Sequence, residues 1–187
     1  MRLYDTRDEM IKDLIKPGSR ILEVGVFIGE FAKKLYDTRP EHLDLVDPWS
    51  GILPSGDQDG NDVRVVDLDS VYPIMKDSLK HCKNITLHRG YSFDVLPNLP
   101  DNYYDFIYID SSHSYEGTKK ELLLALHKIK RGGVIALHDY EVNKAKCKND
   151  YNFGVGKAVD EFCQEFFYSI DYKALDGCVS VGIRIAN

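Results

Sequence analysis

The side chains that could carry chemistry in this sequence are acidic, hydroxyl and imidazole groups at or just beyond the ends of short apolar runs. They are Glu23, Asp47, Ser92, Asp110, His113, His138 and Asp139. Carboxylates accept hydrogen bonds from hydroxyl and ammonium groups, and carboxylate and imidazole together bind divalent metal ions. Imidazole also exchanges a proton near neutral pH. These groups suit ligand binding, metal binding and proton transfer, provided that the fold brings them together.

The segment from Arg20 to Phe31 predicts a strand, a tight glycine turn and the first turn of a helix. Gly25 and Gly29 have no Cβ, so the backbone can turn sharply there and approach a ligand closely. A helix that begins near Gly29 would direct its unpaired N–H groups toward the same point. An ordinary strand-to-helix turn explains a lone glycine pair equally well, so other residues must decide.

Hydrophobic periodicity predicts helices and strands that alternate along the chain. Helices are expected over residues 5–15, 29–36, 67–82, 119–130 and 156–166. Strands are expected over residues 20–24, 43–47, 84–88, 104–110, 134–137, 166–174 and 178–185. Residues 49–61 and 140–153 are polar and predict loops, 131–133 should end the preceding helix, and the last two strands should form an antiparallel hairpin. This alternation is typical of an α/β fold with a mainly parallel sheet.

The polar groups of the first paragraph follow five different predicted strands. In open α/β sheets, ligands bind beyond the carboxyl ends of the strands, near the point where the strand order reverses. Five strands that each deliver a polar group to one edge favour a binding site over an ordinary turn.

Composition places further bounds on the protein. The chain has 187 residues, a net charge of −6 and 43% apolar residues, so we expect one domain over 1–187 and no general nucleic-acid binding. No segment reaches the roughly 18 apolar residues of a membrane span. The N-terminal residues lack the apolar core of a signal peptide, and the four cysteines form no CxxC pair, so a reducing, cytoplasmic location is expected.

From about residue 19 to 185 the chain resembles class I S-adenosylmethionine-dependent methyltransferases. Glu23-Val-Gly25-Val-Phe27-Ile-Gly29 is similar to their acidic-x-Gly-x-x-x-Gly motif, with Phe27 where a central glycine is common. The resemblance implies a Rossmann-like fold with a seven-stranded, mostly parallel sheet, an antiparallel last strand and helices on both faces. A dinucleotide-binding domain would need a Gly-x-Gly-x-x-Gly pattern, which the sequence does not supply.

The resemblance also implies where S-adenosylmethionine binds. Asp47 matches the acidic residue that holds the ribose hydroxyls, and 90–92 resembles the turn that borders the adenine. The implied cofactor-binding residues are Glu23, Gly25, Val26, Phe27, Gly29, Asp47, Trp49, Gly90, Ser92 and Asp110.

A narrower similarity, to macrocin-type sugar O-methyltransferases and cephalosporin-hydroxylase-like proteins, rests on Asp110-Ser-Ser-His113-Ser-Tyr115-Glu116, on His138-Asp139 and on the run 46–49. It implies a divalent metal, Mg²⁺ or Mn²⁺, on Asp110, His138 and Asp139, and His113 and Asp110 as catalytic residues, with His113 the general base. His138 stands where that branch often has an acidic residue. Structural alternatives are a His113 that caps the next helix, an Asp110 that binds backbone amides and a His138 in the core.

The sequence therefore predicts a metal-assisted O-methyltransferase of a sugar or other polyhydroxy small molecule, or of a glycoconjugate. A catechol or amine methyltransferase and a non-catalytic cofactor-binding relative are the alternatives. Acceptor recognition is expected from the 48–66 loop, the 140–153 loop, the N-terminal helix or a partner subunit in a homo-oligomer; no nucleic acid or membrane partner is expected. Trp49 and Tyr115 could stack on a ring or only pack, and Lys144, Lys146 and Lys148 could attract a phosphate or only be solvated.

Overall fold

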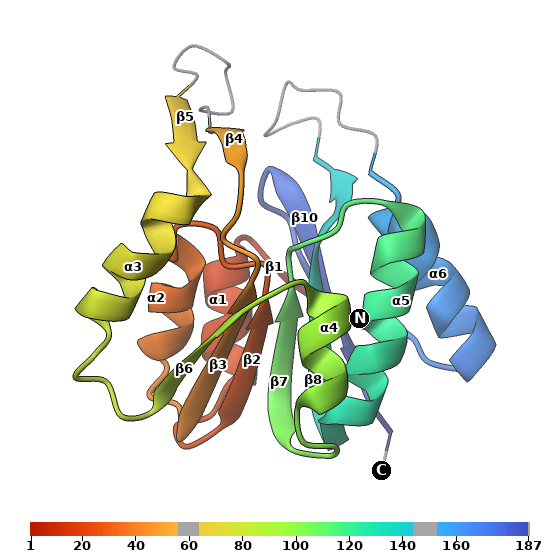
Figure 1. Cartoon of the computed structure of the whole chain (residues 1–187). Coiled ribbons are helices and arrows are strands. Elements are labelled where there is room, and N and C mark those ends of the chain that lie inside the picture. The colour runs from red at the N-terminus through yellow and green to blue at the C-terminus, as the bar shows by residue number, and fades with distance from the viewer. Residues whose placement is uncertain (56–63, 144–152, 187) are drawn as a thin grey trace.

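An eight-stranded sheet forms the centre of the computed structural model, which describes residues 1–55, 64–143 and 153–186 (Figure 1). Its strands are β1 (Arg2–Tyr4), β2 (Arg20–Val24), β3 (His42–Asp47), β6 (Ile85–Arg89), β7 (Tyr104–Ile109), β8 (Ile129–Val142), β9 (Ile170–Ala174) and β10 (Cys178–Arg184), in the order β1-β9-β10-β8-β7-β2-β3-β6. The run from β8 to β6 is parallel, and β10 is antiparallel to both of its neighbours. The predicted α/β class, with its mostly parallel sheet and reversed last strand, is confirmed, with eight strands where seven were expected.

Helices cover both faces of this sheet (Figure 1). They are α1 (Arg7–Leu14), α2 (Glu30–Tyr36), α3 (Leu68–Ser78), α4 (Ser92–Val95), α5 (Tyr115–Lys128) and α6 (Val155–Phe166), with a short 3₁₀ turn over Leu96–Asn98. One apolar cluster joins the sheet to α1, α2 and α3, and a second joins it to α5 and α6. None of the helices in the described ranges combines the length and apolar character that crossing a bilayer requires.

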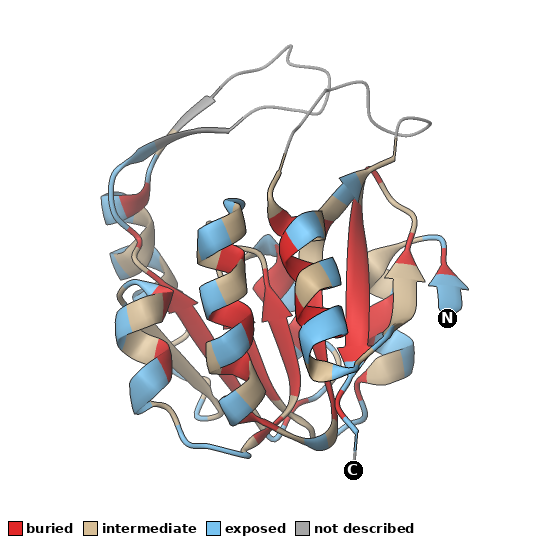
Figure 2. Ribbon diagram, turned by 90° about the vertical axis from the view of Figure 1, so that its right-hand side faces the viewer, coloured by how far each residue is buried: buried red, intermediate tan, exposed pale blue. Residues whose placement is uncertain are grey.

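Strand β7 shows why the sheet is buried on both sides (Figure 2). Ile107 and Ile109 belong to the cluster under α5 and α6, whereas Phe106 and Tyr108 belong to the cluster under α1 and α2. Successive side chains of a strand point to opposite faces, so an uninterrupted apolar run supplies both clusters. Each fully buried large side chain contributes about 1.5–3 kcal/mol relative to an exposed one. The central strands therefore hold the cleft residues at their ends in fixed positions.

The segment 131–133 was expected to end a helix, but it lies inside β8. Helix α5 begins at Tyr115 and ends at Lys128, and β8 runs from Ile129 well past the predicted end at residue 137. The register between β7 and β8 shifts between Tyr104 and Phe106, and Gly132 has a φ of +78°. The glycine thus permits an irregularity within the strand.

Two more stretches differ from the sequence prediction. Strand β4 (Ile52–Ser55) lies within the predicted 49–61 loop and pairs antiparallel with β5 (Arg64–Asp67), which follows that loop. The short strand β1, which was not predicted, pairs parallel with β9. Such short or isolated strands bury few side chains, so the hydrophobic pattern carries little signal for them. The lysines proposed for phosphate binding, Lys144, Lys146 and Lys148, lie outside the described residues.

Candidate active site

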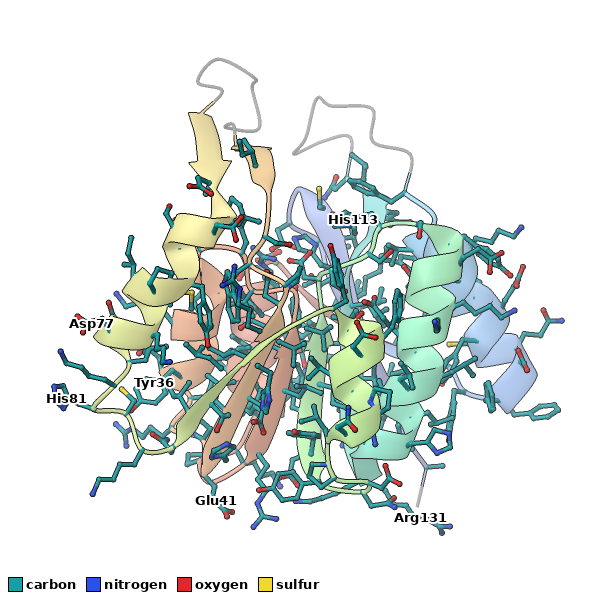
Figure 3. All side chains as sticks on the ribbon, viewed as in Figure 1. Tyr36, Glu41, Asp77, His81, His113 and Arg131 are labelled. Atoms are coloured by element: carbon teal, nitrogen blue, oxygen red, sulfur yellow. The ribbon has the colours of Figure 1, made fainter. Side chains whose placement is uncertain are left out.

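A cavity of about 670 Å³ opens at the carboxyl ends of β2, β3, β6 and β7. Of the predicted site residues, those that line it are Glu23, Gly25, Val26, Phe27, Asp47, Ser92, Asp110 and His113. The predicted residues that do not line it are Gly29, Trp49, Gly90, His138 and Asp139. Its volume lies in the range of small-molecule sites. The labelled His113 lies at this end of the sheet, far from His81 on the outer surface (Figure 3).

The glycine turn packs directly on the end of β7. Gly25 has a φ of +87°, and a Cβ there would lie 2.0 Å from the carbonyl oxygen of Asp110 and 2.8 Å from the Cα of Ser111. No other residue could occupy this position without moving the β7 end. Gly29, whose φ is +83°, begins α2, and the N–H of Gly90 donates to the backbone carbonyl of Asp47 at 3.0 Å. These two glycines shape the walls and lie outside the lining.

Asp47 fixes the same turn from β3. Its Oδ2 accepts hydrogen bonds from the backbone N–H groups of Val26 and Phe27 at 2.9 and 3.0 Å, and its Oδ1 accepts from the N–H of Trp49 at 2.6 Å. A carboxylate offers about four lone-pair sites, so about one is left for a ligand. Asp47 therefore positions the loop and still faces the cavity.

The two candidate stacking aromatics, Trp49 and Tyr115, are not among the residues that line the cavity, which agrees with the alternative that they only pack. The side chain of Trp49 is fully buried, its Nε1–H donates to the carbonyl of Phe27 at 2.9 Å, and its ring lies 5.3 Å from that of Tyr72. The hydroxyl of Tyr115 donates to Glu161 on α6. Both side chains therefore hold neighbouring segments of the chain together.

Glu23 is a buried carboxylate with an unpartnered oxygen. It is only 1% exposed, and its Oε2 has no hydrogen-bond partner within the described chain. Burial raises the pKa of Glu23 well above its ordinary value, and the negative charges of Asp110 and Asp47 add to this shift. An ammonium or hydroxyl group in the cavity would supply the missing hydrogen bond.

Arg7 brings a positive charge into the cavity that sequence reasoning missed. Its Nη1 donates to the hydroxyl of Tyr108 at 3.3 Å and lies 3.5 Å from Oδ2 of Asp110, and its guanidinium stands 4.6 Å from the ring centre of Phe31. It is the first residue of α1, which Thr6 caps by accepting from the N–H of Glu9. The sequence pattern did not separate it from the other arginines of the N-terminal region.

Glu121 is a second missed residue. It lies on the inner face of α5, is 1% exposed and lines the cavity. The hydroxyls of Ser92 and Ser111 both donate to its Oε1, at 2.5 and 2.7 Å. An acidic residue beside the apolar positions of a predicted helix is the signal that could have found it.

His113 and Asp139 form a pair at the cavity's edge. Nδ1 of His113 lies 2.8 Å from Oδ2 of Asp139. This hydrogen bond raises the pKa of His113, while at Asp139 the hydrogen bond from His113 and the nearby His138 outweigh burial and lower the pKa. The carboxylate thus orients the imidazole, leaving Nε2 as its basic nitrogen. The backbone of Asp139 has a φ of +59°, a strained value for a residue with a side chain.

The cluster with metal-ligand spacing differs from the predicted one by a single histidine. Ligand atoms of Asp110, His113 and Asp139 all lie within 4.8 Å of one another. Nδ1 of His138 instead accepts from the backbone N–H of Asp139 at 2.8 Å. In place of the predicted His138, it is thus His113 whose ring nitrogen lies close to the carboxylates of Asp110 and Asp139. Burial raises the pKa of Asp110, and a neighbouring cation would offset that cost. Two carboxylates and one imidazole fit a divalent metal.

Comparison with protein families gives one match. The model of a family described as a methyltransferase domain matches residues 22–140, which include the glycine turn, the His113 loop and most of β8. A search of curated proteins by sequence finds no significant match.

Solved structures of methyltransferases share the fold. The O-methyltransferase NovP aligns at a TM-score of 0.66 and 20% identity, over 97% of this chain and 80% of its own. An O-methyltransferase from Bacillus cereus, solved in complex with SAH (S-adenosylhomocysteine), aligns at 0.62 and 14% identity, over 95% of this chain and 78% of its own. The N-methyltransferase NodS from Bradyrhizobium japonicum aligns at 0.66 and 12% identity, over 97% and 95%. At such identities the likeness establishes the fold alone.

Proposed function

The chain belongs to this methyltransferase-domain family, and on that premise we propose that it transfers a methyl group from S-adenosylmethionine to a hydroxyl group of a small molecule. The observation that carries the choice of a hydroxyl is the pair of His113 and Asp139 at the edge of the cavity. A sugar hydroxyl is a weak acid, so its methylation needs a base, whereas an amine acceptor needs less help.

Different cavity residues bind different groups of the cofactor. S-adenosylmethionine supplies an electrophilic methyl group on a positively charged sulfur. Glu23 accepts hydrogen bonds from the ammonium group of its methionine portion, and Arg7 donates to the carboxylate. Asp47 uses its remaining acceptor site for a ribose hydroxyl. The unpartnered Oε2 of Glu23 and the single arginine or lysine among the described lining residues support this assignment.

His113 removes the proton of the acceptor hydroxyl. Asp139 holds the imidazole through Nδ1, so Nε2 takes the proton, and the carboxylate stabilises the imidazolium that forms. The alignment of the acceptor with the methyl group supplies the rest of the acceleration, because the in-line displacement offers little else for protein groups to do.

A metal ion is the second element of the proposal. Asp110, His113 and Asp139 would hold it, and it would stabilise the acceptor oxygen as an alkoxide in place of the imidazole base, because an imidazole that binds a metal has no second basic nitrogen. The imidazole in this set favours Mn²⁺, Fe²⁺ or Zn²⁺ over Mg²⁺, which prefers oxygen ligands alone. Sugars and related polyhydroxy compounds are the acceptor class we propose, with catechols next and a non-catalytic cofactor-binding role last.

The first test is calorimetric titration of the protein with S-adenosylhomocysteine, repeated with Mg²⁺, Mn²⁺ and EDTA. We expect micromolar binding to the wild type, and a metal-dependent heat if the second element holds. Absence of binding under every condition would overturn the proposed function.

The second test compares His113→Asn with His81→Asn, an exposed histidine far from the cavity (Figure 3). On a sugar that supports methyl transfer, His113→Asn should lower turnover by about 10²–10⁴-fold with little change in S-adenosylhomocysteine affinity, while the control stays at the wild-type rate. Equal rates for both variants would exclude His113 as the base.

A further inference from the structure

Glu121 combines deep burial with an oxygen that has no partner. Its side chain is 1% exposed, yet Oε2 makes no hydrogen bond within the described chain, although the residue lines the cavity. Leaving a buried carboxylate oxygen without a donor costs stability. We propose that Glu121 recognises the 6-amino group of the cofactor's adenine ring and so distinguishes adenine from 6-oxo purines. This inference rests on the proposed function and names the specificity residue of its cofactor site.

Two hydroxyl groups fix the orientation of this carboxylate. Ser92 follows β6, Ser111 follows β7, and both donate to Oε1 of Glu121. Ser92 begins α4 and Ser111 lies in the loop after β7, so the two hydroxyls reach the same oxygen from different segments. The second oxygen, Oε2, has no donor among the described residues.

The opposite ends of the cavity differ in the ligand groups that they suit. Arg7 and Phe31 come from α1 and α2, on one face of the sheet. Glu121 comes from α5, which packs on the other face, and Phe93 comes from α4, which contacts α5. A ligand that carries a carboxylate at one end would direct it toward Arg7, so the flat purine base lies toward Phe93 and Glu121. Apolar and aromatic surface suits the ring, and one acceptor suits its amine.

The chemistry of the donor decides what Glu121 can distinguish. A carboxylate only accepts hydrogen bonds, and the 6-amino group of adenine donates. Hypoxanthine has a carbonyl oxygen at the same position, so two acceptors would face each other. The amide of glutamine can donate to that carbonyl, so Glu121→Gln should remove the preference or reverse it.

The experiment measures binding of S-adenosylhomocysteine and of its deaminated analogue, S-inosylhomocysteine, by calorimetry. The wild type should bind the adenine compound at least about tenfold more tightly, the effect of one hydrogen bond to a charged group. For Glu121→Gln this ratio should fall to about threefold or less, or invert. Glu116→Gln, the same change at an exposed site of α5, should keep the wild-type ratio.

The ratio of two affinities on one protein is insensitive to partial unfolding, which weakens both ligands alike. If Glu121→Gln keeps the wild-type ratio, then Glu121 only holds the two serine loops, and the inference is wrong. If the wild type binds both compounds equally, no residue distinguishes the 6-amino group, so the inference is wrong while the proposed function stands. A wild type that binds neither compound would overturn both.

Discussion

Two buried acidic side chains on neighbouring strands have opposite surroundings. Asp44 on β3 is paired in register with Leu22 of β2, and Glu23 is the next residue along β2. Asp44 accepts from the hydroxyl of Tyr104 at 2.9 Å and lies 2.7 Å from Nε2 of His88. Glu23, one step nearer the carboxyl end, keeps an oxygen without a partner.

The difference suggests that a buried acidic side chain can serve either stability or ligand binding, depending on its hydrogen-bond partners. Burial of a polar group is tolerable when hydrogen bonds replace its hydration, and Asp44 meets this condition through protein groups alone. Glu23 and Glu121 each keep one oxygen that no group of the described chain reaches. We therefore propose that a buried acid with an open oxygen at the cavity contacts a ligand, whereas a fully partnered acid such as Asp44 serves the structure.

Replacement of Asp44 should cost the most stability. Asp44→Ala leaves Tyr104 and His88 without their acceptor, and we expect a loss of about 3 kcal/mol in the free energy of unfolding. Urea unfolding followed by the fluorescence of Trp49, the chain's one tryptophan, measures the loss. Asp77→Ala removes an exposed acid that pairs with Lys80 and should change stability by no more than about 0.5 kcal/mol. Equal losses of stability for the two variants would show that Asp44 stabilises the fold no more than an exposed acid does.

Replacement of Glu23 should separate binding from stability. Glu23→Gln removes the charged acceptor for an ammonium group, so the affinity for S-adenosylhomocysteine should fall by roughly 30-fold, about 2 kcal/mol. The ligand-free variant should be no less stable than the wild type at pH 8, because the amide removes a buried charge. Calorimetry and urea unfolding on the same samples measure the two effects.

The pH dependence of that stability follows from the raised pKa of Glu23. The folded state holds this proton more tightly than the unfolded state, whose pKa is near 4.5, so the stabilisation is full below pH 4.5 and is lost as the pH rises through the folded-state pKa. Relative to Glu23→Gln, the ligand-free wild type should therefore lose stability as the pH rises above about 4.5, over the range that ends above the raised pKa. A wild type that gains on the variant over this range would show that Glu23 has a hidden partner.

The sequence was informative where a residue ends a strand. Glu23, Asp47, Ser92, Asp110 and Asp139 were predicted to meet at one edge of the sheet; the first four line the cavity, and Asp139 pairs with His113 at its edge. Apolar runs mark the strands of a parallel sheet, and their carboxyl ends converge by topology. The sequence could not tell that Asp47 would spend three hydrogen bonds on the loop backbone, since that depends on the turn's exact path.

The sequence did not predict which helix residues line the cavity or in which direction the histidine rings point. Periodicity shows which face of a helix is buried, but it does not show that Glu121 meets two serines from distant loops or that Arg7 reaches Asp110. His138 and Asp139 are adjacent in the chain, which favoured a shared ligand role. Their side chains nevertheless differ in direction, and His113 takes the place in the cluster.

The smallest effect is expected at Asp176, where an open oxygen lies outside the cavity. Its Oδ2 accepts from the backbone N–H of Arg7 at 3.1 Å, and its buried Oδ1 has no partner within the described chain. Asp176→Asn keeps an acceptor for Arg7 and the side-chain shape, so stability should change by about 0.5 kcal/mol or less and S-adenosylhomocysteine affinity by less than about twofold. The assays used for Glu23→Gln measure both. An affinity loss as large as that of Glu23→Gln would show that position at the strand ends makes no difference, and it would contradict the rule drawn from Asp44 and Glu23.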